Sequence, residues 1–420
     1  MARVKFIHTA DLHLDTPFRG LTQINSELAA KVKNATFKAF ENIVDKCISE
    51  QVDFLIIAGD IFDRESKSLG AQLKFVDQLK RLSKKGISTY FICGNHDPLC
   101  SWMENLDLPE KVFRLGSQCV ETHTFFKNGN ALANICGISY QDKALVENVS
   151  LNYINDDKDV PFGIALLHGN VSGNTSHGNY APFSIEDLEN NTFDYWALGH
   201  IHLRQILKGK DPVIIYPGNP QGRDFGEMGE RGCFVVELST DSNPTITFSP
   251  THLIRFEDIQ VDLTGVCENS ELINKIRNEV AALGDISVDD NLIIRLTLNG
   301  RTPLHLILAD EGNKSSILDN LNEGAFLGSS FKYFDKMIVS TQPELDLEEL
   351  KNASNFVASI LTEFEAFEND CHKNDELIRR LTGELSSPQI RKLLIELTVR
   401  DKQEIFEQAK LGLLDKFSIE

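Results

Sequence analysis

Five short polar motifs lie in the first half of the sequence, and each directly follows an apolar, β-branched run. They are Asp11-Leu12-His13, Gly59-Asp60-Ile61-Phe62-Asp63, Gly94-Asn95-His96-Asp97, Leu167-His168-Gly169-Asn170 and Gly199-His200-Ile201-His202. Carboxylate, amide and imidazole side chains suit divalent ions of intermediate hardness, and the motifs supply enough of them for two adjacent ions. Two such ions can activate water and stabilise an in-line displacement at phosphorus. The pattern therefore predicts metal-assisted hydrolysis of a phosphoester.

Each motif on its own also has an ordinary structural explanation. An isolated Asp-x-His is most often a turn, and Gly-Asp after a strand is often a turn with a cap. The stretch Gly94-Asn95-His96-Asp97 is rarer, because three consecutive polar side chains after an apolar run have no packing role. Two imidazoles at i and i+2, as in His200 and His202, suit ligation from an extended segment. Because all five motifs follow strand-like runs, we favour one shared site.

The segments that precede the first three motifs are predicted to be strands of one sheet. Val4–His8, Phe54–Ala58 and Thr89–Cys93 are short apolar runs, and helical periodicity occupies Ser26–Glu50 and Ala71–Lys85 between them. This β-α-β-α-β order predicts a parallel start to the sheet. Ligands bind outside the carboxyl ends of such strands, so the motifs are expected to converge there.

From about residue 110 to residue 250 the apolar runs become shorter, and Lys127-Asn128-Gly129-Asn130 is typical of a hairpin turn. The last runs of this region are expected to form a closing antiparallel set: Val213–Tyr216, Cys233–Leu238 and Thr245–Phe248. We predict an α/β fold class, with a two-sheet sandwich flanked by helices over residues 1–250. A small α+β unit over residues 251–343 and a charged helical segment over residues 344–420 are expected to follow.

The composition is that of a globular, acidic protein. The 420 residues carry a formal net charge of −20, which argues against a general coat for nucleic acid. Residues 1–250 hold 24 Lys and Arg against 31 Asp and Glu, and residues 251–420 hold 18 against 31. The excess of negative charge is therefore larger in the C-terminal part of the chain. No apolar stretch reaches the roughly 20 residues that cross a bilayer. The scattered cysteines and the N-terminus without a secretory pattern predict a reduced, cytoplasmic protein.

The motif series resembles that of the calcineurin-like metallophosphoesterases, in which D-x-H, G-D-x-x-D, G-N-H-D, a strand-end H and G-H-x-H follow one another. The resemblance covers about residues 4–250. The stretch Phe6-Ile7-His8-Thr9-Ala10-Asp11-Leu12-His13-Leu14-Asp15 resembles the start of the SbcD-like DNA-repair exonucleases. Together with Tyr216-Pro217-Gly218-Asn219-Pro220-Gln221-Gly222-Arg223, it looks most like the bacterial YhaO group.

The resemblance implies two divalent metal ions, with Mn²⁺ as the expected ion, and a role for each motif residue. One ion would be held by four side chains: Asp11, His13, Asp60 and His202. The other would be held by Asp60, Asn95, His168 and His200, so that Asp60 bridges the two ions. His96 would stay free of metal and would stabilise the transition state or protonate the leaving oxygen, with Asp97 orienting its ring.

The second motif departs from the phosphomonoesterases of the superfamily. Those enzymes usually continue it as D-R-G, whereas this chain has Asp63-Arg64-Glu65. Some nuclease relatives have a His at the position of Asp63, and bacterial SbcD-like proteins have an Asp. The role of Asp63 is therefore left open. Arg64 either contacts the substrate phosphate or pairs on the surface, and the sequence does not separate the two.

The function implied by the resemblance is a Mn²⁺-dependent DNA nuclease, expected to be an exonuclease in DNA repair. In this family a small capping domain shapes access to DNA, and residues 251–343 match it in size and order. A C-terminal helical segment often docks on a coiled-coil ATPase of the SMC type. Residues 344–420 would serve a YhaN- or SbcC-like partner in this way, or would pack on their own domain. The helical face around Ala29–Val44 could form a homodimer.

Two other functions stay open at this point. The first is a phosphodiesterase or phosphatase for a small nucleotide, which the motifs fit equally well. The second is a non-catalytic scaffold with the same fold, although such proteins typically lose metal ligands and this chain keeps them all. The chain has no G-x-x-x-x-G-K-[ST] phosphate loop, so an ATPase activity would have to come from a partner.

Overall fold

The computed structural model describes residues 2–16, 18, 26–63, 68–99, 107–116, 118–141, 145, 147–172, 180–283, 291–344, 358–359, 361–362 and 364. Contacts divide the chain into two compact units. The first comprises Met1–Ile259, Leu283–Leu296 and Leu318–Met337, and the second comprises Gln260–Ala282, Thr297–Ile317 and Ile338–Glu420. Among the described residues, no helix combines the length and the apolar character needed to cross a membrane.

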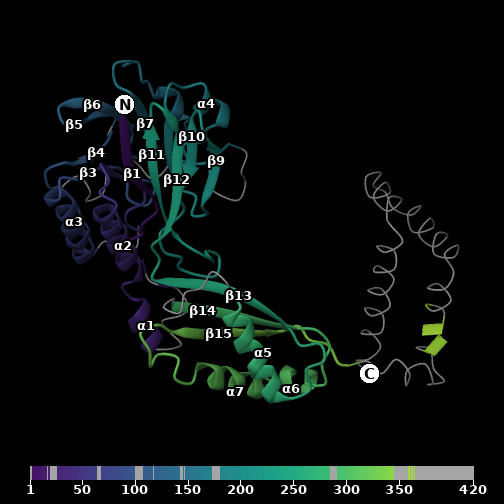
Figure 1. The fold of residues 1–420 in the computed structure, drawn as a ribbon. Helices are drawn as coiled ribbons and strands as arrows, with labels where there is room; N and C mark the ends of the chain where they lie inside the picture. Colours follow the sequence, from purple (N-terminus) through teal and green to yellow (C-terminus); the bar gives the residue numbers. More distant parts are fainter. Residues whose placement is uncertain are drawn as a thin grey trace. The chain divides into compact units, whose positions relative to one another are not determined.

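A six-stranded sheet carries the first three motifs, with the strand order β12-β11-β1-β2-β3-β4 (Figure 1). Its strands are β1 (Arg3–Thr9), β2 (Phe54–Ala58), β3 (Ser88–Ile92), β4 (Val112–Arg114), β11 (Gly232–Ser239) and β12 (Ser242–Pro250). Strands β1 to β4 run parallel, as the β-α-β-α-β pattern predicts, and β11 joins β1 in antiparallel register. The carboxyl ends of β1, β2 and β3 therefore meet at one edge.

A second six-stranded sheet carries the other two motifs, with the strand order β5-β6-β7-β8-β10-β9. Its strands are β5 (Glu121–Lys127), β6 (Asn130–Gly137), β7 (Phe162–His168), β8 (Tyr195–Gly199), β9 (Gln205–Gly209) and β10 (Val213–Tyr216). The hairpin between β5 and β6 turns at Asn128 and Gly129, whose φ angles of 55° and 81° match the predicted two-residue turn. Strands β7 and β8 are parallel neighbours, which brings His168 and Gly199 into register.

The alternation of side chains along each strand builds three apolar layers. Phe6 of β1 packs with Phe54 and Tyr195 in a core between the two sheets, whereas Ile7 faces the helices outside the first sheet. A third cluster around Trp196 covers the outer face of the second sheet, with the short helices η2 (Val149–Asn152) and α4 (Ile185–Glu189) beside it. These layers confirm the predicted α/β two-sheet sandwich flanked by helices.

Two helices cover the outer face of the first sheet: α2 (Ala35–Ser49) and α3 (Leu69–Lys84). Both present buried residues at helical spacing, and Ser68 caps α3 by accepting a 3.0 Å hydrogen bond from Ala71 N. The single helix expected over Ser26–Glu50 is wrong. It breaks at Lys33 and Asn34 into α1 (Ser26–Val32) and α2, because Leu28 and Val32 of α1 pack on a separate cluster around Phe256.

The predicted closing antiparallel set is also only partly right. Strands β11 and β12 do form an antiparallel pair, but in the first sheet. Strand β10 belongs to the second sheet, where it runs parallel to β8 and antiparallel to β9. The sequence pattern could not separate these strands, because the continuous apolar run of Val213–Tyr216 has no face that distinguishes one sheet from the other.

After β12, the chain adds a three-stranded sheet in the order β13-β14-β15 and three further helices. The elements are β13 (Ile254–Asp262), α5 (Asn269–Ala281), β14 (Asn291–Asn299), α6 (His305–Ala309), α7 (Glu311–Asn322) and β15 (Lys332–Val339). The order of strands and helices is the one expected after residue 250, but the two compact units divide this region between them, so a separate unit over residues 251–343 stays a prediction. The helical segment expected over residues 344–420 lies, apart from Glu344 and five positions between 358 and 364, outside the described residues.

A buried histidine in the core between the sheets gives the fold a pH dependence. His8 is fully buried, its Nδ1 lies 2.9 Å from Tyr195 Oη, and burial lowers its pKa to about 3. Its unfolded-state pKa is about 6.5, so the unfolded chain binds this proton first. The stability due to neutral His8 is present above pH 6.5 and is lost as the pH falls toward 3.

We predict that His8→Gln makes the free energy of unfolding less dependent on pH between 4 and 6. The slope should fall by up to about 1.4 kcal/mol per pH unit, the value for one proton. Urea unfolding of both proteins at several pH values, with a chelator present throughout, measures the two slopes. Equal slopes would show that His8 does not carry this proton linkage.

Candidate metal centre

The structure brings the five motifs together. The first three follow β1, β2 and β3 in one sheet, and the other two follow β7 and β8 in the facing sheet. Backbone hydrogen bonds join the first two loops: Asp11 N donates to Gly59 O at 3.0 Å, and His13 N donates to Asp60 O at 3.1 Å. Five strand ends thus place their polar side chains around one point, as the sequence predicts.

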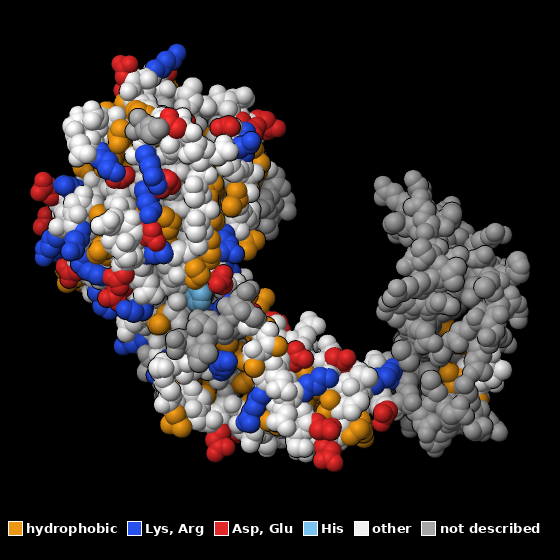
Figure 2. Space-filling view, viewed as in Figure 1, with side chains coloured by type: hydrophobic (Ala, Val, Ile, Leu, Met, Phe, Trp, Pro, Cys, Tyr) orange, Lys and Arg blue, Asp and Glu red, His pale blue; other side chains and the backbone are white. Residues whose placement is uncertain are grey.

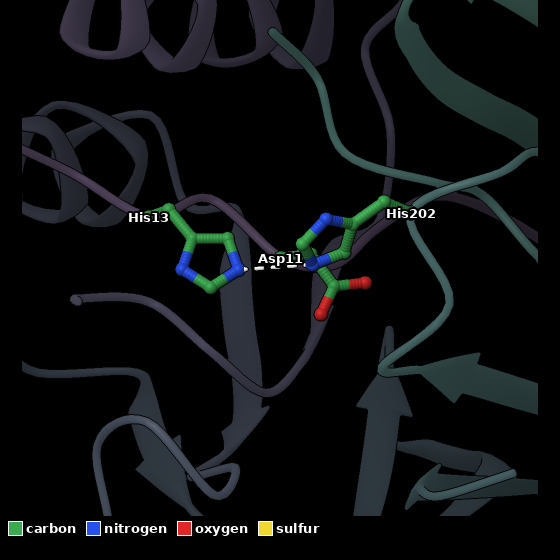
Figure 3. Close-up of side chains that lie close together, drawn as sticks. All are labelled: Asp11, His13 and His202. Carbon is green, nitrogen blue, oxygen red and sulfur yellow. Dashed lines mark hydrogen bonds between the residues drawn. The ribbon is translucent and has the colours of Figure 1, made fainter. Parts of the chain in front are cut away.

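The ligand atoms form overlapping groups, within each of which all atoms lie within 4.8 Å of one another. One group is Asp11, His13 and His202, shown in Figure 3 with its side chains turned toward one another. A second group is Asp60, His168 and His200, and a third is His13, Asp60 and His96. Asp11, His13, Asp60 and His168 are buried, whereas His200, His202 and His96 are partly exposed. Each of the first two groups has the residue types and the spacing to hold a divalent ion.

The carboxylate of Asp60 connects the two groups. Its Oδ2 lies 3.8 Å from His13 Nε2 and 3.4 Å from His168 Nε2. Its Oδ1 accepts a 2.9 Å hydrogen bond from the backbone N–H of His96, which holds the carboxylate in this orientation. Burial raises the pKa of Asp60, but the surrounding imidazoles outweigh it and hold the pKa well below the usual range. Asp60 therefore presents one carboxylate oxygen to an imidazole of each group.

Two close contacts test whether the donor set suits a cation. His168 Nδ1 donates to Ala58 O at 2.9 Å, so its Nε2 faces Asn95 Oδ1 at 3.1 Å. On the other side, His13 Nε2 lies 3.1 Å from His202 Nε2. Atoms that carry lone pairs approach this closely only when a proton or a metal ion lies between them. Burial lowers the pKa of His168, but the negative charge of Asp60 outweighs this effect and raises the pKa to about 9. The surroundings of His168 thus favour a positive charge.

Three motif glycines are required by close contacts. A Cβ on Gly94 would lie 2.2 Å from Asp60 Oδ1, and one on Gly59 would lie 2.4 Å from His168 Nδ1. On Gly199 it would lie 1.9 Å from Ala58 O, the acceptor that orients His168. The glycine before each polar residue therefore lets the strand end approach the ligands, which gives the G-D, G-N-H-D and G-H-x-H patterns a physical reason.

The backbone at the centre is strained as well. Four of the candidate ligands have positive φ angles: Asp11 at 52°, His13 at 42°, Asp60 at 51° and His200 at 95°. Residues other than glycine rarely adopt this region, and each such residue costs about 1–3 kcal/mol. Strain of this kind persists where the surrounding structure determines the conformation, and it clusters at functional sites.

The two remaining motif carboxylates are Asp97, which is expected to orient His96, and Asp63, whose role the sequence leaves open. His96 Nδ1 lies 2.9 Å from Asp63 Oδ1, so Asp63 is the carboxylate that orients this ring. Asp97 is buried and accepts backbone hydrogen bonds, at 2.7 Å from Gly94 N and at 2.7 Å from Ile61 N. The expectation that Asp97 orients His96 is therefore wrong, because both of its oxygens hold the backbone of the neighbouring loops. Burial and the nearby Asp60 charge raise the pKa of Asp97 to about 7.

Sequence reasoning missed the residues that surround His202. Its Nδ1 lies 2.7 Å from Glu227 Oε1, and Glu227 is in turn bound by Arg223 and Asn219. Asn219 and Arg223 belong to the stretch Tyr216–Arg223 that carries the resemblance, but nothing near Glu227 in the sequence marks it as part of a site. Arg64, which the sequence offered as a contact for the substrate phosphate, lies outside the described residues.

A cavity of about 650 Å³ opens beside the centre. Asp60, His96, His200 and His202 line it, together with residues of the loop around Glu227. This volume is within the range of about 300–1,000 Å³ found for small-molecule sites. A substrate in this cavity would contact both the candidate ligands and the His96 ring.

Comparisons with known proteins agree with this geometry. A family model described as calcineurin-like phosphoesterase matches residues 4–204, and a model of the middle domain of the metallophosphoesterase YhaO matches residues 256–342. The chain is 37% identical to the "Uncharacterized metallophosphoesterase YhaO" of Bacillus subtilis over 345 residues, which are 82% of this chain and 84% of that protein.

More distant relatives are also similar over long stretches. The "DNA double-strand break repair protein Mre11" of Archaeoglobus fulgidus is 23% identical over 418 residues, 94% of this chain and 84% of that protein. The protein of the same name from Methanococcus maripaludis is 29% identical over 297 residues, 66% of this chain and 71% of that protein. The resemblance seen in the motifs is confirmed.

We predict that Asp97→Asn destabilises the protein, whereas Asp63→Asn does not. An amide at position 97 would turn an N–H₂ group toward one of the backbone donors that now bind a carboxylate, at a loss of about 1–3 kcal/mol in the free energy of unfolding. Asp63→Asn should change that free energy by less than about 1 kcal/mol, because its partners lie nearer the surface. Urea unfolding in the presence of a chelator measures both. Equal losses would contradict the assignment of Asp97 as a brace between loops.

Proposed function

The chain belongs to the calcineurin-like phosphoesterase family of hydrolases, and we propose that it is a metal-dependent DNA nuclease that acts as an exonuclease. The observation that carries the proposal is the position of Asp60, whose Oδ2 lies between His13 and His168 and so faces both ligand groups. A carboxylate in this position would help to hold two ions, and two such ions stabilise the attacking and leaving oxygens of a displacement at phosphorus.

Two divalent ions fit the candidate centre, and we propose Mn²⁺ as the ion. Seven side chains would hold them: Asp11, His13, Asp60 and His202 for one ion, and Asp60, Asn95, His168 and His200 for the other. When bound, such ions act as Lewis acids and lower the pKa of water toward neutrality. The protein contributes the orientation of the ligands, through the strained backbone and the backbone hydrogen bonds described above.

We propose that His96 stabilises the transition state or protonates the leaving oxygen. Its side chain is 34% exposed, and its ring lies 5.0 Å from that of His13. Asp63 binds Nδ1 and so orients the ring, and a histidine oriented by a carboxylate can donate a proton or a hydrogen bond to a substrate. Asp97, initially placed beside His96 as a catalytic residue, would act only by holding the loops that carry Asp60 and Asn95.

The choice of DNA as substrate rests on the relatives. Two of them carry names that specify DNA double-strand break repair, and the start of the chain resembles the SbcD-like exonucleases. On the face visible in Figure 2, basic and acidic side chains are interspersed, so no broad positive surface is seen there. With a net charge of −20 on the chain, the metal ions would supply much of the local attraction for a phosphodiester.

The family resemblance extends the proposal to domains and partners. We propose that residues 1–250 form the phosphoesterase domain and that residues 251–343 form a capping domain. Residues 344–420 would dock on an SMC-like coiled-coil ATPase of the YhaN or SbcC type, as in the families that the sequence resembles. A homodimer through Ala29–Val44 has less support, because Val32, Phe40 and Val44 are buried within the chain.

A small nucleotide is the second candidate substrate, because the cavity of about 650 Å³ is large enough to enclose one. Such a substrate would use the same ions and the same His96. The two candidates differ in what binds beyond the phosphate, so they are separated by the substrate and not by the chemistry. A non-catalytic scaffold has no support from the centre, where every candidate ligand is present.

We predict that the full-length protein digests linear DNA in the presence of Mn²⁺ and that a chelator abolishes the activity. Release of nucleotides from end-labelled single-stranded and duplex DNA measures it, with and without an SMC-like partner. Cyclic nucleotides and mononucleotides are tested in parallel. Faster hydrolysis of those small substrates than of DNA would favour the second candidate, and no hydrolysis of any of them would favour a scaffold.

We predict that His96→Ala retains both metal ions but loses most of its turnover, by a factor of about 10²–10⁴, the usual contribution of general acid catalysis. Metal content by mass spectrometry and hydrolysis of bis(p-nitrophenyl) phosphate measure the two properties. His123→Ala, outside the motifs, is the matched control. Loss of metal from His96→Ala would instead make this residue a ligand, as its membership of the third group allows.

A further inference from the structure

Two imidazoles of the candidate centre are oriented by different kinds of acceptor. His168 donates from Nδ1 to the main-chain oxygen of Ala58 at 2.9 Å, so its orientation is part of the sheet. His202 Nδ1 lies 2.7 Å from a side-chain carboxylate, that of Glu227. Within the described part of the chain, another candidate ligand, His13, has no partner for its buried Nδ1. The group of Asp11, His13 and His202 therefore depends on one carboxylate for the orientation of a ligand.

Glu227 is held as a rigid, ionised acceptor. Arg223 binds it from two nitrogens, with Nη2 at 2.8 Å from Oε1 and Nε at 3.2 Å from Oε2. Asn219 Nδ2 and the backbone N–H of Arg223 add hydrogen bonds to Oε2 at 2.8 and 2.9 Å. Burial raises the pKa of Glu227, but its bonds to His202 and Arg223 hold it far below the usual range.

The same contacts determine which nitrogen of His202 faces the centre. Arg223 Nη2 lies 3.1 Å from His202 Nδ1, and a guanidinium can only donate. A carboxylate can only accept, so Nδ1–H and the guanidinium both donate to Glu227. In this tautomer the lone pair of His202 is on Nε2, the atom that lies 3.1 Å from His13 Nε2. Hydrogen bonds from a ligating histidine to a carboxylate also raise the basicity of the ligand.

We infer that Glu227 is a positioning residue that sets the affinity of one metal ion only, the ion of the Asp11, His13 and His202 group. His202 does not belong to the group of Asp60, His168 and His200. In that group, the ring of His168 is oriented by a main-chain oxygen. The inference rests on the proposed two-metal centre and adds that its two ions differ in what organises their ligands. A side chain controls one of them, and the sheet controls the other.

The test is a calorimetric titration of the full-length protein with Mn²⁺. The wild type is expected to bind two ions, and Glu227→Gln should bind one of them 10- to 100-fold more weakly, the usual effect of removing a partner behind a ligand. The other ion should bind as in the wild type. Two unchanged affinities, or two affinities weakened equally, would overturn the inference while leaving the metal centre intact. A wild type that binds no Mn²⁺ would overturn the metal centre itself.

Asp224→Asn is the matched control. Asp224 lies in the same loop and lines the same cavity, and its Oδ1 accepts a hydrogen bond from Gly226 N at 2.7 Å. The substitution removes the same unit of charge without touching His202, so both affinities should stay as in the wild type. An effect equal to that of Glu227→Gln would show that the charge of the loop matters and not the contact with the imidazole.

A second measurement tests the inference even if Glu227→Gln alone weakens metal binding by disturbing the fold. In a His202→Ala background, Glu227→Gln should weaken Mn²⁺ binding no further, because the ring through which it acts is absent. A further loss of affinity there would overturn the inference. Glu227→Asp, which keeps the charge but shortens the side chain, should weaken the same ion to an intermediate degree. Unfolding by urea with a chelator checks that each variant is folded.

Discussion

The rest of the centre depends on the contacts of the Asp60 carboxylate with the imidazoles of both sheets. One oxygen faces both His13 and His168, and the other is held by the backbone N–H of His96. This position brings two strand ends of one sheet into contact with a strand end of the facing sheet. A buried carboxylate costs free energy unless cationic or hydrogen-bond donor groups surround it. The two sheets can therefore pack together here only if the candidate ligands also gather around Asp60.

The strand ends reach Asp60 only because the backbone there is unusual. Asp11, His13 and Asp60 have positive φ angles, and their loops are joined by backbone hydrogen bonds of about 3 Å. Gly94 leaves room for the Asp60 carboxylate, as Gly59 does for the ring of His168. The sandwich core between the sheets, which includes Phe6 and Phe54, offsets this strain by burying a large apolar area. The carboxyl ends of five strands thus hold strained candidate ligands, and the core between the sheets stabilises them in place.

Carboxylates of the same type have different roles because their neighbours differ. Asp60 faces imidazoles, Asp63 binds the ring of His96, and Asp97 accepts backbone N–H groups. Glu227 completes the series from a loop far along the chain, where Arg223 keeps it ionised against His202. Residues around the candidate centre thus orient the rings of His96, His168 and His202, and Glu227 among them belongs to no motif.

The residues themselves determined much of the candidate site. The apolar runs before Asp11, Asp60 and Asn95 specify parallel strands, and parallel strands present their carboxyl ends at one edge, so the meeting of the motifs could be predicted. The sheet of strand β10 and the break between α1 and α2 could not, because an apolar run does not reveal which surface it will contact. Nor could the partner of His96, since Asp63 and Asp97 are both close to the site in sequence.

Tertiary structure alone decided these pairings. Asp63 rather than Asp97 reaches His96, because Asp97 points its oxygens back at Gly94 N and Ile61 N. Glu227 reaches His202 across 25 residues, because the loop that follows β10 turns back onto the strand ends. The sequence by itself determined that the five motifs meet, since the apolar run before each motif indicates a strand that ends there. Which carboxylate faces which imidazole depends on backbone angles and long-range contacts that only the folded chain contains.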